Sequence, residues 1–345
     1  MNKYLFFVTQ NYSFEILRPI QKQILARGDD VAWFLSGKEV NLKTLTADEK
    51  SLATIEDVIS YNADANFVPG NKIPDFFPGI KVQVFHGLEW KKQGHFDIRG
   101  HFDLYCTHGP ATTSRFNQLA AKYKYFQVRE TGWSKLDTLF SASPYHWPKQ
   151  TNKPIILFAP TFSPNLTSAP ALIDEIKRLS EQYDWQWLVK FHPKMNKQWV
   201  KDYQQIENEN LTVVDVNSVN GLLQVADILV SDTSSIIGEF SLLNKPCVTL
   251  NNSKPGNYLI DIDSKSQLEA AILQGLDKEQ QDSDLLNNIK QYALDLHPFN
   301  DGMSSARILD ATEELVTSGL AHLKPKPLNL FRKLKMRKKL GYWKF

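Results

Sequence analysis

Residues 228–240 read Ile-Leu-Val-Ser-Asp-Thr-Ser-Ser-Ile-Ile-Gly-Glu-Phe. The apolar run at the start of this stretch predicts a buried strand, and an apolar helical pattern follows the small hydroxyl and carboxylate side chains. A helix that begins there directs unpaired backbone N–H groups and the positive end of its dipole into the turn. Such a turn can hold a phosphate group, but Ser, Asp and Thr are also the preferred residues at an ordinary helix start. On its own, the turn leaves both interpretations open.

The length and composition of the chain fit a globular protein of two domains. It has 345 residues, 42% hydrophobic and 23% charged, whereas a typical domain holds about 150 residues. Cys106 and Cys247 lie in apolar strand-like runs, so we expect buried thiols and no disulfide framework. Met1–Thr9 predicts a first strand rather than a signal peptide, and no run approaches the ~20 apolar residues of a membrane-spanning helix. We therefore expect a cytoplasmic protein.

The basic residues are concentrated at the C-terminal end. Residues 324–345 hold seven Lys, two Arg and no acid, so with a net charge of +2 for the whole chain the remainder carries −7. Aromatic residues among these cations suit the surface of an anionic membrane, and we expect this tail to associate with the inner face of the cell membrane. A disordered solubilising tail is the alternative. Nucleic acid is not expected as a partner, because the main body is acidic and carries no nucleic-acid motif.

Strands and helices alternate along the chain, which predicts parallel sheets with crossover helices. A Pro-rich stretch at 143–154 interrupts the alternation and indicates a domain boundary. We expect a first domain over 1–146, a second over 147–302, a C-terminal helix over 303–322 and a basic tail over 323–345. The expected strands are Tyr4–Thr9, Val31–Leu35, Ile80–Phe85, Leu104–Thr107 and Phe126–Val128, then Ile155–Ala159, Gln186–Phe191, Leu211–Asp215, Asp227–Val230 and Cys247–Leu250.

Histidines follow two of the expected strands. His86 stands at the carboxyl end of Ile80–Phe85 with Gly87 after it, and a neutral imidazole there suits removal of a proton from an attacking hydroxyl. His192 follows Gln186–Phe191 between cationic neighbours. We expect it to be protonated beside a pyrophosphate, where it would neutralise charge on a departing nucleotide. A histidine that only satisfies a turn is the alternative in each case.

Further polar residues stand at expected strand ends and helix starts. Thr161 follows the first strand of the second domain, and its hydroxyl suits a phosphate. Glu239 lies about two turns into the helix after the serine-rich turn, where a carboxylate can reach a ribose diol. Ser304 and Ser305 open the last helix, a second helix start that can face phosphate. Ordinary turns and caps, or a buried carboxylate, explain each of these residues taken alone.

Short motifs follow one another along most of the chain. They are Phe85-His86-Gly87 with Lys91-Lys92, Gly132–Asp137, Ala159–Phe162, Phe191–Pro193, Ser231–Phe240, Leu243–Pro246 and Asp301–Arg307. In this order they resemble the CDP-glycerol glycerophosphotransferase family, which includes polymerases and primases of wall teichoic acid. The resemblance extends from about residue 80 to 320, and Ser231–Pro246 is its most specific part.

The resemblance implies an α/β protein of GT-B architecture. Two Rossmann-like domains would face a cleft, the first for the acceptor and the second for the nucleotide donor, with the last helix crossing back to the first domain and a basic tail after it. The implied reaction moves glycerol phosphate or a similar polyol phosphate from a CDP-activated donor to a hydroxyl of a cell-envelope glycan or glycolipid. CMP would be released.

The resemblance also assigns roles to individual residues. It implies that His86 is the catalytic base and that His192 assists at the pyrophosphate. The implied donor-binding residues are Thr161, Ser231, Asp232, Thr233, Ser234, Ser235, Glu239, Ser304 and Ser305, and the implied acceptor-side residues are Gly87, Lys91 and Lys92. No acidic pair follows a strand where a donor-binding metal would be expected, so we expect no obligatory metal or other cofactor. Thr233, Gly238 and Trp133 depart from the family pattern, which bears on the donor more than on the fold.

Three other functions stay open from the sequence. A glycosyltransferase of the same fold would use a nucleotide sugar. A nucleotide-sugar 2-epimerase would also share the fold and would have no use for a membrane-binding tail. A non-catalytic subunit of an envelope complex would bind a nucleotide or glycan without turnover.

Overall fold

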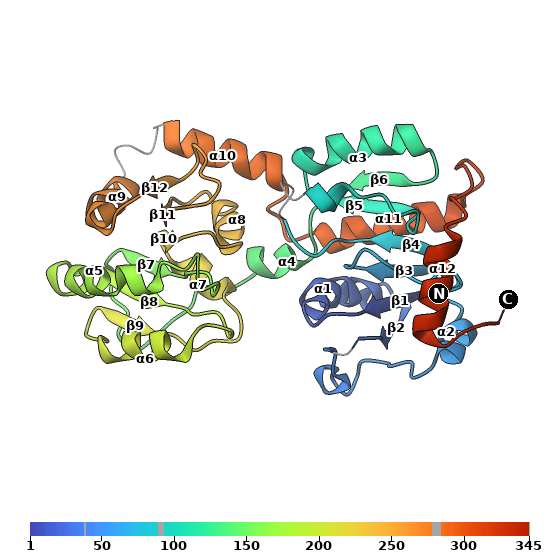
Figure 1. Cartoon of the computed structure of the whole chain (residues 1–345), viewed down its shortest axis with the longest axis horizontal. Coiled ribbons are helices and arrows are strands. Elements are labelled where there is room, and N and C mark those ends of the chain that lie inside the picture. Colours follow the sequence, from blue (N-terminus) through green and yellow to red (C-terminus); the bar gives the residue numbers. More distant parts are fainter. Residues whose placement is uncertain (38, 89–92, 278–283, 345) are drawn as a thin grey trace. The chain divides into compact units, whose positions relative to one another are not determined.

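The computed structural model describes residues 1–37, 39–88, 93–277 and 284–344 and divides into two compact units (Figure 1). Unit 1 comprises Met1–Phe140 and Leu296–Phe345, and unit 2 comprises Ser141–Asp295. The chain thus leaves unit 1 before the Pro-rich stretch, earlier than expected. It returns earlier as well, because the imidazole of His297 accepts a hydrogen bond from the backbone N–H of Trp133 in unit 1 at 2.9 Å.

The sheet of unit 1 has six strands, all parallel, in the order β2-β1-β3-β4-β5-β6. Most of its strand residues are buried, as expected of a parallel sheet covered on both faces. The strands are β1 Lys3–Val8, β2 Asp30–Leu35, β3 Ala65–Val68, β4 Ile80–Gln83, β5 Leu104–Thr107 and β6 Gln127–Glu130.

Helices cover both faces of this sheet. Side chains of α2 and α3 pack with Leu5, Phe7 and Tyr105 on one face. On the other face Phe14 of α1 stacks on Trp33 at 5.4 Å between ring centroids. The helices of unit 1 are α1 Ser13–Ala26, α2 Ile55–Tyr61, α3 Pro110–Tyr123, α4 Lys135–Phe140, α11 Ser304–Ser318 and α12 Leu330–Leu340, with short 3-10 turns at Leu42–Thr44 and Gln93–Phe96.

The expected last helix is confirmed as α11, and it lies beside α1 (Figure 1). Arg27 holds the pair together, because its guanidinium contacts Asp310 at 2.6 Å and Glu313 at 2.9 Å. The helix that follows unit 2 in sequence is therefore part of the α/β layer of unit 1.

The basic C-terminal segment is also folded against unit 1. Lys326 pairs with Asp103 at 2.6 Å, and the ring of Tyr342 stacks on Phe76 at 4.6 Å between centroids. Arg337 is buried. The alternative of a disordered tail is therefore wrong for residues 324–344, most of which lie in or beside α12.

Unit 2 repeats the architecture with a six-stranded parallel sheet in the order β12-β11-β10-β7-β8-β9. Apolar side chains from α5, α6 and α9 pack with the strands in a core cluster on one face of this sheet. The strands are β7 Ile155–Phe158, β8 Gln186–Val189, β9 Leu211–Val213, β10 Ile228–Ser231, β11 Cys247–Leu250 and β12 Ile260–Ile262. The helices are α5 Ala169–Gln182, α6 Lys197–Gln205, α7 Asn220–Val225, α8 Ile236–Ser241, a 3-10 turn at Lys265–Gln267, α9 Leu268–Leu276 and α10 Asp284–Leu296, which ends where unit 1 resumes.

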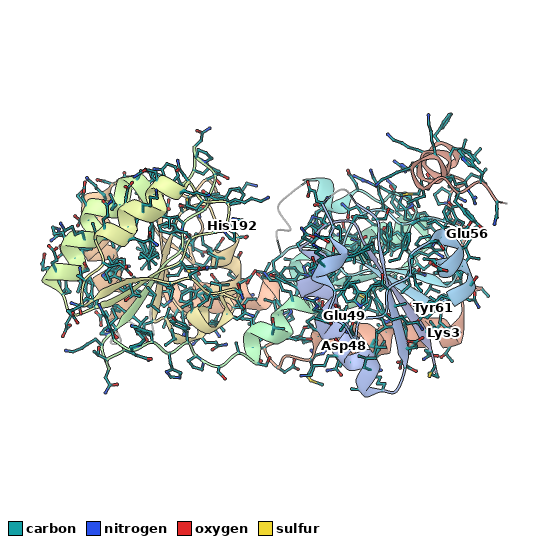
Figure 2. All side chains as sticks on the ribbon, turned by 90° about the horizontal axis from the view of Figure 1, so that it is seen from below. Lys3, Asp48, Glu49, Glu56, Tyr61 and His192 are labelled. Carbon is teal, nitrogen blue, oxygen red and sulfur yellow. The ribbon has the colours of Figure 1, made fainter. Side chains whose placement is uncertain are left out.

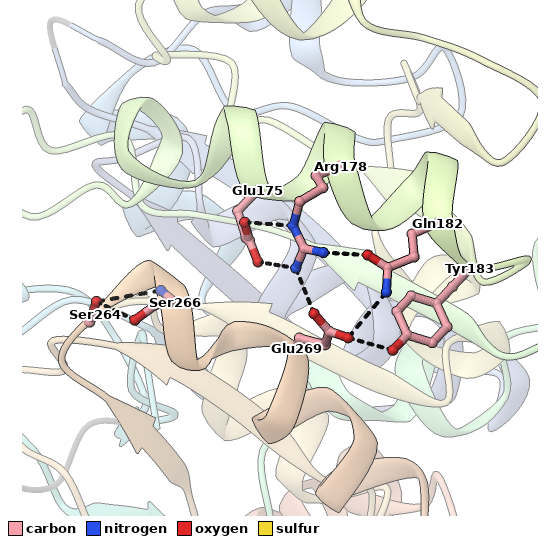
Figure 3. A network of polar contacts seen from close by, with 7 residues as sticks. All are labelled: Glu175, Arg178, Gln182, Tyr183, Ser264, Ser266 and Glu269. Atoms are coloured by element: carbon pink, nitrogen blue, oxygen red, sulfur yellow. Dashed lines mark hydrogen bonds and ion pairs between the residues drawn. The ribbon is translucent and has the colours of Figure 1, made fainter.

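A polar network fixes α9 to α5 on the surface of unit 2 (Figure 3). Arg178 contacts Glu175 on its own helix and Glu269 on α9, each at 2.6 Å, and the hydroxyl of Tyr183 donates to Glu269. The network joins α5 to α9 and contains none of the predicted site residues. We therefore assign it to the stability of unit 2.

Both cysteines are buried and free, which confirms the expectation from the sequence. In the part of the chain that the structure describes, no helix combines the length and the apolar character needed to span a bilayer.

Candidate active site

His86 stands beyond the carboxyl end of β4, on an unusual turn of the backbone. The residue before it, Phe85, has a φ of 58°, a left-handed conformation that bulky residues rarely adopt. The Phe85 ring is buried against His95 and Phe116, with ring centroids 4.9 and 5.2 Å away, and this packing offsets the cost of the backbone conformation. Strain of this kind persists where the surroundings enforce it and is common at functional sites. Here it turns His86 out to an exposed position.

The contacts of the His86 ring fix its tautomer. Nδ1 lies 3.3 Å from the carbonyl oxygen of Pro69, which can only accept, so Nδ1 carries the proton of the neutral ring. The ring of Tyr12, which lies between β1 and α1, stacks on it with centroids 5.4 Å apart. Nε2 of the neutral imidazole therefore keeps its lone pair, and the geometry suits a general base. Neither Pro69 nor Tyr12 was among the residues singled out from the sequence.

The acceptor-side residues are only partly described. Among the described residues, a Cβ built on Gly87 meets no atom within 4 Å, and its φ is not left-handed, so neither packing against them nor backbone strain requires glycine there. The left-handed turn of the backbone lies at Phe85. The open space suits the close approach of a ligand to the backbone. Lys91 and Lys92 lie outside the described residues.

A third strand-end histidine was missed by the sequence analysis. His108 follows β5 as His86 follows β4, and this repeated position was the available signal. It is 1% exposed, and among the residues that the structure describes neither ring nitrogen finds a hydrogen-bond partner. Burial, with smaller effects of His95, His297 and His86, lowers the pKa of His108 well below 6.5. The buried His108 ring packs against Phe85 and Trp133, with centroids 5.3 and 5.7 Å away, and does not face solvent.

The Gly132–Asp137 motif holds unit 1 together instead of facing a ligand. Both carboxylate oxygens of Asp137 accept from the start of α11, at 2.8 Å from the N–H of Ser304 and 2.7 Å from that of Ser305. Ser304 and Ser305 are each 1% exposed. The expected role of these two serines in donor binding is therefore corrected: a carboxylate of unit 1 already occupies the helix start.

In unit 2, two residues of the serine-rich turn point into the protein. The hydroxyl of Ser231 donates to the carbonyl of Ala159 at 2.7 Å. The Asp232 carboxylate accepts from the N–H of Thr161 at 2.9 Å and from the N–H and hydroxyl of Ser168 at 2.8 and 2.9 Å. Both side chains are fully buried. They are corrected from donor contacts to structural residues that join the ends of β7 and β10.

The following residues of the turn are more accessible. The Thr233 hydroxyl accepts from the N–H of Ser253 at 3.0 Å, which joins this turn to the loop after β11. Ser234 is partly exposed and Ser235 is exposed. The turn thus presents hydroxyl groups at the carboxyl edge of the sheet, where ligands of open α/β sheets bind.

His192 stands beyond β8 at the same edge and is labelled in Figure 2. Its Nδ1 accepts from the N–H of Lys194 at 3.1 Å, so the proton of the neutral ring lies on Nε2. Burial, followed by the charges of Lys194 and Lys190, lowers the pKa of His192 below 6.5. This shift favours the neutral ring, which offers its Nε2–H as a donor, whereas protonation of His192 beside a bound pyrophosphate stays a prediction.

Two further predicted residues differ in accessibility. Phe162, next to Thr161, stacks on the ring of His192 with centroids 4.4 Å apart, which places the loop after β7 beside the loop after β8. Thr161 itself is partly exposed. Glu239, in contrast, is only 7% exposed within α8, so its carboxylate does not face solvent.

Among the residues that the structure describes, no group of three or more His, Cys, Asp or Glu side chains could hold a metal ion.

Comparison with known proteins identifies the family. A model described as CDP-Glycerol:Poly(glycerophosphate) glycerophosphotransferase matches residues 89–314, more than half of the chain. The chain belongs to this glycerophosphotransferase family. It is 34% identical over 220 residues to the teichoic acid glycerol-phosphate primase of Bacillus spizizenii, covering 62% of this chain and 48% of that protein. It is 26% identical over 279 residues to the teichoic acid poly(ribitol-phosphate) polymerase of the same species, covering 70% and 42%.

Solved structures of other proteins share the fold of this glycerophosphotransferase chain. The wall teichoic acid polymerase TagF superimposes with a TM-score of 0.64 at 16% identity, covering 93% of this chain and 90% of that one. A UDP-N-acetylglucosamine 2-epimerase superimposes with a TM-score of 0.59 at 13% identity, covering 95% and 99%. These likenesses establish the α/β fold of GT-B type. The chain spans about half the length of the relatives matched by sequence.

Proposed function

We propose that this protein transfers a polyol phosphate from a CDP-activated donor to a hydroxyl of a lipid-linked or glycan acceptor, with release of CMP. The family membership supports the reaction class. The observation that carries the proposal is the tautomer of His86, because its Nδ1 contact with the Pro69 carbonyl leaves Nε2 free at an exposed strand end. A base with this geometry is what the attack of a hydroxyl requires.

In the proposed step, an acceptor hydroxyl attacks the phosphorus that bears the polyol. One O–P bond forms, the bond from that phosphorus to the oxygen of CMP breaks, and the hydroxyl proton passes to Nε2 of His86. The proton then leaves to solvent when the product departs. Most of the rate would come from positioning and from fixed dipoles at the pyrophosphate, as in other phosphoryl-group transfers.

We assign the donor to the strand-end edge of unit 2. The Nε2–H of His192 and the hydroxyls of Thr161, Thr233, Ser234 and Ser235 supply hydrogen-bond donors for pyrophosphate oxygens. His192 enters as a neutral donor, and the negative charge of a bound pyrophosphate would favour its protonation. The ribose contact proposed for Glu239 requires its buried carboxylate to turn outward on binding.

We propose further that residues 324–344 bring the protein to an anionic membrane. Lys335 and Lys338 are exposed on α12 beside the apolar side chains of Phe331 and Leu334, which are 91% and 45% exposed. Apolar groups among cations suit the interface of an anionic bilayer, where each cation contributes about 1 kcal/mol. A membrane-embedded acceptor would make this location useful.

A panel of CDP-glycerol, CDP-ribitol, UDP-N-acetylglucosamine and GDP-mannose, scored for thermal shift and nucleotide release, tests the proposal. We expect binding and release of CMP with the CDP-polyols only, with and without EDTA, because no metal is proposed to take part. His86→Ala should lower the rate at least 100-fold and leave CDP affinity unchanged. His146→Ala, at an exposed histidine of unit 2, is the control. Turnover of a UDP-sugar, or a wild-type rate in His86→Ala, would reject this function.

A further inference from the structure

The loops that follow β1, β3 and β4 come together around His86 at one edge of unit 1. These three strands are neighbours in the sheet, and because the sheet is parallel their carboxyl ends lie at the same edge. Tyr12 lies in the loop after β1, Pro69 directly follows β3, and His86 follows β4. The orientation of the exposed His86 ring therefore depends on residues from two neighbouring loops.

The carbonyl of Pro69 accepts the hydrogen bond that fixes the His86 tautomer, yet it belongs to no strand. β3 ends at Val68, and residues 69–71 form bends. The ladder between β3 and β4 closes just before them, where the N–H of Val84 donates to the carbonyl of Val68 at 3.1 Å. A carbonyl beyond the end of a ladder needs a partner outside the ladder to keep one direction.

Gln83, the last residue of β4, supplies that partner. Its side-chain nitrogen donates to the Pro69 carbonyl at 3.2 Å, and a longer contact of 3.4 Å joins the same nitrogen to Oδ1 of Asn71. The two hydrogens of this amide can thus serve one acceptor each in the same loop. A carbonyl oxygen has two lone pairs, so Pro69 can accept from Gln83 and from His86 together.

The burial of Gln83 indicates that these contacts are needed. Gln83 is 1% exposed, although glutamine usually lies at protein surfaces. Burial of an amide is unfavourable unless its hydrogen bonds are made inside the protein. What this amide adds to the end of β4 is a fixed contact with the loop after β3.

The ring of Tyr12 restrains the His86 imidazole in a different way. The two rings stack with centroids 5.4 Å apart and an angle of 29° between their planes. Stacking limits the tilt of the imidazole, but it is compatible with a flipped ring in which Nδ1 faces away from Pro69. The choice of the nitrogen that remains available therefore depends on the Pro69 carbonyl and, through it, on Gln83.

We propose that Gln83 is a positioning residue for His86. It holds the Pro69 carbonyl in place, so that Nδ1 of His86 keeps its proton and Nε2 is the nitrogen that accepts one. The inference rests on the proposed function, because His86 acts as a base only in that reaction. The alternative is that Gln83 serves only the stability of unit 1.

Gln83→Met tests the inference, because it nearly keeps the size of the side chain and removes its hydrogen bonds. The matched control is Gln186→Met. Gln186, the first residue of β8, is 2% exposed, and its amide accepts from the N–H of Thr151 at 2.7 Å and donates to the carbonyl of Lys149 at 2.8 Å. Each variant loses two hydrogen bonds of a buried strand glutamine. We expect kcat for CMP release to fall about tenfold further in Gln83→Met than in the control, at unchanged CDP affinity.

NMR of protein with isotope-labelled histidine reports the tautomer directly, at a pH where the His86 ring is neutral, with His86→Ala to assign the signals. We expect the Nδ1–H tautomer in the wild type and in Gln186→Met, and a mixture of both tautomers in Gln83→Met. A loss of stability alone does not produce this change. An Nε2–H tautomer in the wild type would overturn the inference, as would the wild-type tautomer in Gln83→Met.

The tautomer is measured without substrate, so the two proposals can fail separately. If the wild type turns over no CDP-polyol but Gln83→Met changes the tautomer, the proposed function fails and the positioning role stands. If Gln83→Met does not fold, Asn71→Ala decides, since it removes only the longer contact from a partly exposed position. We then expect a smaller change of tautomer that Asn71→Asp, which keeps an acceptor, reverses. No change in Asn71→Ala would overturn the inference.

Discussion

Asp232 and its neighbours show that one short turn contains both structural and functional positions. The Ser231 hydroxyl and the Asp232 carboxylate form hydrogen bonds inside unit 2, whereas the side chains of Ser234 and Ser235 are accessible to solvent. The sequence marks the turn but does not separate these roles, because the partners of Ser231 and Asp232 lie in the loop after β7, some 70 residues earlier.

A matched pair of serine variants tests this division. Ser231→Ala removes a buried hydrogen bond and should lower the free energy of unfolding by about 1 kcal/mol, with little effect on CDP affinity. Ser234→Ala removes no side-chain hydrogen bond seen within the described parts of the chain, and it should weaken CDP binding roughly tenfold at unchanged stability if the hydroxyl contacts the donor. Urea unfolding and calorimetric titration with CDP measure the two effects. The opposite pattern would reverse the assignment.

The two amide substitutions of His192 separate its two ring nitrogens. In His192→Asn, the amide oxygen can replace Nδ1 as acceptor for the Lys194 N–H, but the Nε2–H donor is lost. In His192→Gln, the longer side chain can place an N–H near the position of Nε2–H. We expect the Asn variant to lose at least tenfold more of its CMP-release rate than the Gln variant. Equal rates would show that Nε2–H makes no contact with the donor.

At the scale of elements, Gly132 shows why the end of β6 tolerates little change. Its φ is 80°, and an added Cβ would lie 2.4 Å from the Ser304 hydroxyl and 2.7 Å from Nε2 of His297. Gly28 has a similar φ of 77°, yet an added Cβ there meets nothing within 4 Å. Gly28→Ala should therefore cost only the backbone strain, about 1 kcal/mol, and Gly132→Ala about 3 kcal/mol or more. Equal losses in urea unfolding would contradict the packing argument.

Most strands could be predicted because a buried parallel strand is a continuous apolar run. β3 and β12 were missed, since Asn66 and Asp261 interrupt their short apolar runs. α12 was missed for a different reason. Its inward face includes Lys333 and Arg337, whose partner Asp75 is more than 250 residues away, so the apolar pattern of the helix alone does not reveal that face.

At the scale of the whole molecule, the sequence could not reveal the contacts that join residues 296–344 to the N-terminal part of unit 1. Asp137 caps α11, His297 accepts from Trp133, and Tyr342 stacks on Phe76. Each joins segments far apart in the chain. Deletion of residues 324–345 would therefore remove structural contacts of unit 1 along with any membrane contact, and point substitutions on α12 are the cleaner probe.

Unit 1 carries buried histidines that predict loss of stability in acid. Burial is the main cause that lowers the pKa of His101 and of His297 to about 4, compared with about 6.5 in an unfolded chain. As the pH falls from 6.5 toward 4, the unfolded state binds protons that the folded state does not, so the free energy of unfolding falls in this window. Above pH 7 both states are neutral at these residues, and their contribution no longer depends on pH.

The expected loss between pH 7.5 and pH 5 is on the order of 1 kcal/mol for each of these histidines, after discounting for the partial exposure of His101. His101→Gln removes one of the titrating groups, so its urea-unfolding free energy should fall less over the same interval than that of the wild type. The comparison is made between two pH values for each protein, which cancels any constant effect of the substitution. If the two proteins lose the same free energy on acidification, His101 does not remain neutral in the folded state and the burial argument is wrong.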